Sequence, residues 1–118
     1  MSGLIATVLL REPYTPCVSG EVGRLLREVS PAVQESRSSY HWELTIRECF
    51  LTIDIRPTNP VYGDFDDLLV SLELDYDDVP ELIEISSNSS GSFDQEHVTR
   101  LATMLAERLD GIYTGIQS

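Results

Sequence analysis

Hydrophobic and polar residues alternate between Tyr40 and Arg56, and the phase of the alternation changes near Arg47 and Glu48. A period of two predicts β-strands with one buried face, and a change of phase predicts a tight turn or a bulge. A single strand of this length would be unusual. The stretch is therefore predicted to form two antiparallel strands joined by a hairpin, with Trp42 in the core.

Two further strands are predicted downstream of this hairpin. Residues 68–76 alternate between apolar and polar side chains, which places Glu73 and Asp75 on the outward face of a third strand. The sequence Asp-Asp-Val-Pro then predicts a turn, and residues 81–87 predict a fourth strand. Residues 4–10 form an apolar run whose Ile, Thr and Val content favours a strand, with a short helix as the alternative.

The C-terminal segment has the hydrophobic spacing of an amphipathic helix. The predicted helix covers residues 93–109 and follows Ser92, which is a favourable capping residue. It is expected to end near Asp110 and Gly111, because glycine commonly follows the last helical turn. Ile112 is interpreted as the last member of its apolar stripe.

A second amphipathic helix is predicted after Ser19, with an interruption or restart at Ser30 and Pro31. Together these elements predict a single α+β domain over residues 1–118. Its two layers are an antiparallel sheet of four to five strands and two amphipathic helices packed on one face of that sheet. The other face is left open. Its predicted outward residues are Glu43, Thr45, Arg47, Thr52, Asp54, Arg56, Ser71, Glu73, Asp75, Glu84 and Ser86, together with Phe50 and Leu69.

Negative charge is concentrated in one part of the chain. The net charge is −12, and all eight basic residues are arginines. No basic residue occurs between Arg56 and Arg100. The carboxylates of this interval are Asp64, Asp66, Asp67, Glu73, Asp75, Asp77, Asp78, Glu81, Glu84, Asp94 and Glu96. Like charges at this density repel one another and lower folding stability unless something offsets them.

The charge and the hydropathy of the chain exclude several classes of function. A strongly acidic protein lacks the Lys and Arg residues that nucleic acids and anionic membranes attract. The apolar run at residues 4–10 is too short to cross a bilayer and lacks the flanks of a signal peptide. We therefore expect a cytoplasmic protein in which Cys17 and Cys49 are reduced thiols. We also expect that the protein binds neither nucleic acid nor a membrane.

No motif indicates catalysis or metal binding. The acidic stretch at residues 75–81 resembles a calcium loop only in carboxylate density, because Pro80 stands where an EF-hand needs glycine. His41 and His97 lie in no recognisable catalytic arrangement. The cysteines lack metal-ligand spacing, and no glycine-rich phosphate loop is present. We predict no enzymatic activity, no cofactor and no metal site.

The open acidic face of the predicted sheet suggests a binding surface for a basic partner. This face combines carboxylates with an exposed aromatic residue and a leucine. A face that only contacts solvent does not need such apolar residues. The alternative is a charged face that serves only solubility. The predicted partner-binding residues are Phe50, Asp54, Glu73, Asp75, Asp77, Asp78 and Glu84.

In size, charge and layout, the chain resembles the small acidic immunity proteins that accompany bacterial antibacterial toxins, including contact-dependent and type VI toxins. The resemblance covers the whole chain and no motif carries it. It implies a monomer or weak dimer that binds a basic cognate toxin and blocks its active site. Two alternatives remain open. One is an acidic secretion chaperone for an effector protein, and the other is an inhibitor whose carboxylates imitate nucleic-acid phosphates.

Overall fold

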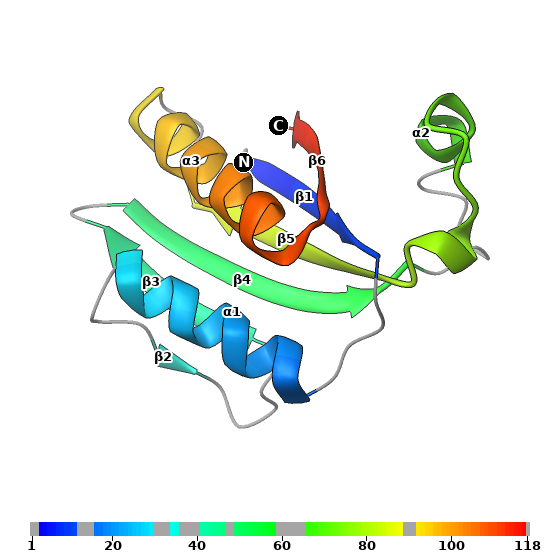
Figure 1. Ribbon diagram of the computed structural model, residues 1–118. Helices are drawn as coiled ribbons and strands as arrows, with labels where there is room; N and C mark the ends of the chain where they lie inside the picture. The colour runs from blue at the N-terminus through cyan, green and yellow to red at the C-terminus, as the bar shows by residue number, and fades with distance from the viewer. Residues whose placement is uncertain are drawn as a thin grey trace.

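Two helices pack on one face of an antiparallel sheet, as predicted (Figure 1). The computed structural model describes residues 3–11, 16–29, 34–35, 41–46, 49–58, 66–88 and 92–117. The elements in chain order are β1 (Ile5–Leu10), α1 (Pro16–Val29), β2 (Gln34–Glu35), β3 (His41–Ile46), β4 (Cys49–Pro57), α2 (Asp66–Ser71), the 3-10 helix η2 (Tyr76–Asp78), β5 (Glu81–Ser87), α3 (Ser92–Leu109) and β6 (Ile112–Gln117). The strand order is β2-β3-β4-β5-β1-β6, and β2 has only two residues.

The predicted hairpin is confirmed by the antiparallel pairing of β3 and β4. Trp42 lies opposite Ile53, and Leu44 lies opposite Leu51. All four side chains are buried beneath the helices, as the alternation requires. The turn predicted at residues 47–48 lies outside the described residues.

The fourth predicted strand is also confirmed, and residues 4–10 contain a strand rather than a helix. β5 lies between β4 and β1 at the centre of the sheet, with Ile83 opposite Val8 and Ile85 opposite Ala6. Leu9 points to the face opposite Val8 and is nevertheless fully buried. A strand that is covered on both faces at one end has a nearly continuous apolar sequence, which explains the ambiguous pattern.

The third predicted strand, at residues 68–76, is wrong. The chain instead forms α2 and η2, and the amide of Leu72 donates to the carbonyl of Leu68 at 3.0 Å. Leu69, which was assigned to the outward face, is only 2% exposed. Both edges of β5 are already paired, so no strand can be inserted beside it. The apparent alternation misled because residues four apart share a face in a helix as well as in a strand.

The edge strand β6 was not predicted, because Ile112 was assigned to the preceding helix. The helix does end at Leu109, as expected. Asp110 has φ 54°, and the amide of Gly111 donates to the carbonyl of Ala106 at 2.8 Å. A left-handed residue with this hydrogen bond is the usual end of a helix. The chain then turns back along β1, where Ile112 lies opposite Leu9.

The helices and the inner face of the sheet share one hydrophobic core. Val22 and Leu25 of α1 and Val98 and Leu105 of α3 are all fully buried in it. Figure 1 shows α1 in front of the β3–β4 hairpin and α3 in front of β1 and β5. α1 begins at Pro16, before the predicted start at Ser19, which agrees with the preference for proline in the first helical turn. The interruption predicted at residues 30–31 lies outside the described residues.

Candidate protein-binding surface

The open face predicted for the hairpin and β5 is present, and three predicted site residues lie on it. Phe50 and Asp54 come from β4, and Glu84 comes from β5. These positions alternate with buried residues, so their side chains point away from the helices. Phe50 is 38% exposed. The strands thus hold this part of the candidate site on a rigid scaffold.

The two predicted site carboxylates on this face have cationic or titratable partners within the chain. Asp54 and Glu84 are direct cross-strand neighbours, an arrangement in which like charges repel. His41 Nδ1 lies 2.5 Å from Asp54 Oδ1. Arg56 Nη2 donates to Glu84 Oε2 at 2.8 Å. These contacts offset the repulsion, and they also reduce the charge that the sheet face offers to a partner.

The role of His41 was missed by the sequence analysis, although the sequence contains a signal for it. A hairpin turn at residues 47–48 places residue 41 opposite residue 54, which is the register that the structure has. His41 Nε2 also lies 3.4 Å from Glu43 Oε1. The hydrogen bond with Asp54 is the main cause that raises the pKa of His41, and burial works against it.

The raised pKa of His41 predicts a pH-dependent contribution to stability. A folded pKa above the unfolded value of 6.5 gives stabilisation that is complete below the unfolded pKa. The stabilisation is lost as the pH rises through the folded pKa. In denaturant unfolding, we therefore expect His41→Gln to lower the free energy of unfolding by at most about 1 kcal/mol at about pH 6, because His41 and Asp54 are partly exposed. The cost should shrink towards about pH 9.

Asp54→Asn provides the matched control for this pH series, because it removes the acceptor instead of the histidine. The two variants should lose stability with the same pH dependence, and the double variant should lose little more than either one. A cost of His41→Gln that stays constant across the series would show that His41 acts through packing rather than through its charge.

The other four predicted site residues lie elsewhere, and the assignment of Glu73 and Asp75 to the sheet face is wrong. Glu73 follows α2 in a left-handed conformation with φ 58°. Asp75 precedes η2, and its amide donates to Asp78 Oδ2 at 2.9 Å. Asp77 and Asp78 belong to η2. The structure therefore brings these residues together, but separates them from the pair on the strands.

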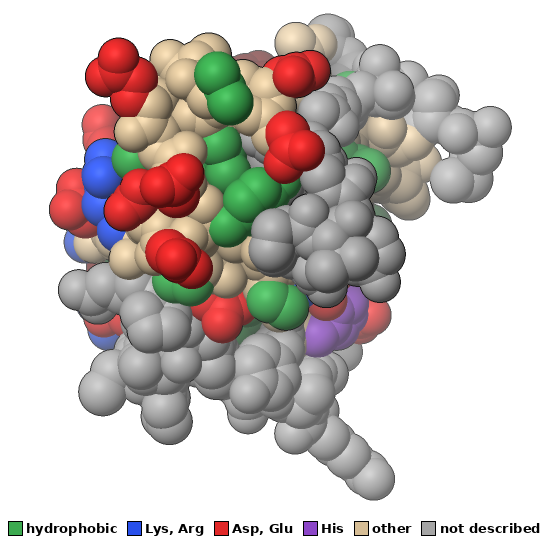
Figure 2. Space-filling view, turned by 90° about the vertical axis from the view of Figure 1, so that its right-hand side faces the viewer, with side chains coloured by type: hydrophobic (Ala, Val, Ile, Leu, Met, Phe, Trp, Pro, Cys, Tyr) green, Lys and Arg blue, Asp and Glu red, His purple; other side chains and the backbone are tan. Residues whose placement is uncertain are grey.

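The segment from α2 to η2 forms an acidic end of the molecule. Figure 2 shows carboxylates around hydrophobic side chains on this side. Val70 is 77% exposed and Leu72 is 40% exposed. The exposed carboxylates of the segment are Asp66, Asp67, Glu73, Asp75, Asp77 and Asp78. Among the described residues, no ion pair joins any of them to an arginine. Six carboxylates without a described arginine partner are therefore gathered at this end.

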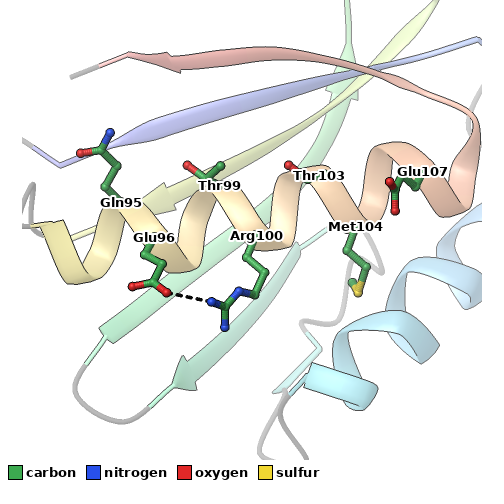
Figure 3. Close-up of a pocket in the computed structure, with 7 residues that line it drawn as sticks. All are labelled: Gln95, Glu96, Thr99, Arg100, Thr103, Met104 and Glu107. Atoms are coloured by element: carbon green, nitrogen blue, oxygen red, sulfur yellow. Dashed lines mark hydrogen bonds and ion pairs between the residues drawn. The ribbon is translucent and has the colours of Figure 1, made fainter.

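The helical face of the molecule has a shallow groove along α3, with a volume of about 680 Å³. In Figure 3, Glu96 and Arg100 form an ion pair, with Arg100 Nη2 2.7 Å from Glu96 Oε1. Met104 points towards α1. An apolar recess of about 210 Å³ lies beside Leu101 and Met104.

Cys49 and Asp94 form a buried contact that the sequence did not reveal. Burial, followed by the negative charge of Asp94, raises the pKa of Cys49 to about 11. Asp94 lies in the first turn of α3 and is only 7% exposed. Its Oδ2 atom has no hydrogen-bond partner among the described residues. A thiol that stays protonated is a poor nucleophile and a poor metal ligand.

Within the described residues, no three His, Cys, Asp or Glu side chains are grouped so that they could hold a metal ion. Also within them, no helix has the length and apolar character needed to cross a membrane. No family model matches the sequence, and neither a curated protein nor a solved structure matches it.

Proposed function

We propose that this protein binds a basic partner protein through its acidic surface and neutralises that partner. The observation that carries the proposal is the acidic end formed by α2 and η2, where exposed carboxylates without arginine partners surround exposed apolar side chains. The resemblance to immunity proteins adds the class of partner. In this proposal the partner is a cognate bacterial toxin, and the complex forms in the cytoplasm and blocks the toxin's active site.

Electrostatic physics supports a binding role for such a surface. Complementary potentials speed the encounter of two proteins and exclude partners of the wrong charge. The same surface lowers folding stability through self-repulsion. Arg56 and His41 offset the carboxylates on the sheet face, whereas no described cation lies close enough to pair with those at the acidic end. Solubility alone does not require like charges to be concentrated at one end of the molecule.

The test is protection of a bacterial host from toxins encoded beside this gene. Wild-type protein should restore growth when it is produced with its cognate toxin. Asp67→Arg combined with Asp77→Arg should slow association by about tenfold or more at low salt and should abolish protection. These two exposed acids are preferable to Glu73 and Asp75, which lie in the turn that leads into η2.

The matched control combines Glu96→Arg with Glu107→Arg, which changes the net charge by the same amount on α3. Glu96 forms only an exposed ion pair with Arg100, so little stability should be lost. The control should protect as well as the wild type, and the association rate of the wild type should fall as salt increases. Failure of the wild type to protect against any neighbouring toxin would refute the proposed function.

A further inference from the structure

The short helix α2 exposes two aliphatic side chains that have no role in the core. Leu69 is the one residue of α2 that is fully buried, and it belongs to a hydrophobic cluster with Leu9, Val79 and Leu82. Val70, the next residue of the helix, is 77% exposed, and Leu72 just beyond the helix is 40% exposed. Most other exposed positions of this segment are carboxylates.

Folding does not explain an exposed valine in this helix. A helix of six residues is marginal on its own, so its stability depends on packing of the buried face. Valine also loses side-chain freedom in a helix, which makes it a poorer choice than alanine or glutamate at an exposed position. Scattered exposed apolar residues are normal. Here, however, two of them lie only two residues apart, in a segment whose other exposed positions are mostly carboxylates.

This arrangement matches the anatomy of a protein–protein interface. Such interfaces have an apolar centre that becomes fully desolvated and a polar rim that stays accessible. A few central side chains carry most of the binding energy, and the rim excludes water from them. Val70 and Leu72 would form the centre, while Asp66, Asp67 and Asp77 would contribute to the rim.

We infer that this surface, here called the α2 surface, docks a basic amphipathic segment of the partner protein. It consists of Val70 and Leu72 with the exposed carboxylates Asp66, Asp67, Glu73 and Asp77. An aliphatic or aromatic side chain of the partner contacts Val70 and Leu72, and flanking Arg or Lys side chains face the carboxylates. The inference rests on the proposed function and assigns the anchor to α2 rather than to Phe50 on the sheet.

Charge complementarity favours a basic segment over the other possible ligands of the α2 surface. A second copy of the chain would bring two uncompensated acidic rims together, which costs free energy. An anionic lipid surface would be repelled for the same reason. A cation alone would not use the exposed apolar centre. A basic segment with an apolar side would match both features of the surface.

The experiment uses two synthetic helical peptides of equal length and equal positive charge. One peptide carries leucines at helical spacing between arginines, and the other carries serines in place of the leucines. Their affinities for the whole protein are measured by titration calorimetry. The wild type should bind the leucine peptide about tenfold more tightly than the serine peptide. Val70→Ser with Leu72→Ser should remove this preference and leave the serine peptide unaffected.

Val29→Ser on α1 is the matched control, because Val29 and Leu72 are 38% and 40% exposed and Val29 lies outside the candidate site. It should leave both affinities unchanged. If the double variant does not fold, Val70→Thr replaces it, since this change alters one methyl group at the more exposed position. Equal binding of the two peptides, no binding of either, or loss of the preference in Val29→Ser would each overturn the inference.

The protection experiment separates this inference from the proposed function. If the wild type protects and the Val70→Ser, Leu72→Ser variant protects equally, the α2 surface is not the anchor and the proposed function stands. If the wild type protects against no toxin, the proposed function fails whatever the peptides show. Loss of protection in the folded variant, with protection retained in Val29→Ser, supports both.

Discussion

Replacing Leu101 with alanine is expected to lower the free energy of unfolding by about 2–5 kcal/mol. Leu101 lies on the inner side of α3 and is 2% exposed. It belongs to the same core cluster as Val98 and Leu105 from its own helix and Ile83 from the sheet. Alanine would lose the transfer free energy of the deleted atoms and would leave a cavity that the sheet cannot fill completely. Urea unfolding followed by far-UV circular dichroism measures this loss.

Thr103→Ala is the matched control for Leu101→Ala. Thr103 lies on the same helix and is exposed, and alanine has a higher helix propensity than threonine. Its unfolding free energy should stay within about 0.5 kcal/mol of the wild type or rise slightly. A loss below about half a kcal/mol for Leu101→Ala would contradict the placement of α3 on the sheet.

The elements with a strong hydrophobic period were predicted from the sequence. The α3 stripe, the β3–β4 hairpin and β5 each have enough apolar residues at one period to identify both the type of element and its buried face. The two-layer α+β arrangement follows from these faces, because each must be covered by another layer.

Hydrophobic periodicity does not identify elements that are short or covered on both faces. α2 buries only Leu69, so residues 68–76 offer no helical stripe that would oppose the strand pattern. β6 begins with Ile112, which continues the helical spacing of α3. Its assignment depends on its pairing with β1, at the other end of the chain. Contacts between segments so distant in sequence leave no local signal.

The acidic character of the candidate site was predicted from the sequence, but the positions of only some of its residues were. Composition alone reveals the interval without basic residues. The pairing of Arg56 with Glu84 depends on the register between β4 and β5, which are separated by α2 and η2. This pairing compensates Glu84 on the sheet face, whereas the six exposed carboxylates of α2, η2 and the turn between them have no described arginine partner. The exposure of Val70 follows from the helix that the sequence analysis missed.

Close packing around Gly111 leads to the second large stability effect. A Cβ atom at Gly111 would lie 2.8 Å from the backbone oxygen of Leu9 and 2.9 Å from Val8 Cγ1. Both neighbours belong to β1, a central strand paired with β5 and β6, so neither can move freely. We expect Gly111→Ala to lower the free energy of unfolding by about 1–3 kcal/mol, since the backbone must shift to make room.

The same substitution at Gly20 should have the opposite sign. Gly20 lies inside α1, and no atom lies within 4 Å of the position that its Cβ would occupy. Gly20→Ala should therefore raise the free energy of unfolding by about 0.5–1 kcal/mol, because alanine restricts the unfolded chain and favours the helix. Urea midpoints of the two variants, at unchanged slope, measure the difference. A Gly111→Ala variant as stable as Gly20→Ala would show that the turn from α3 into β6 does not approach β1 this closely.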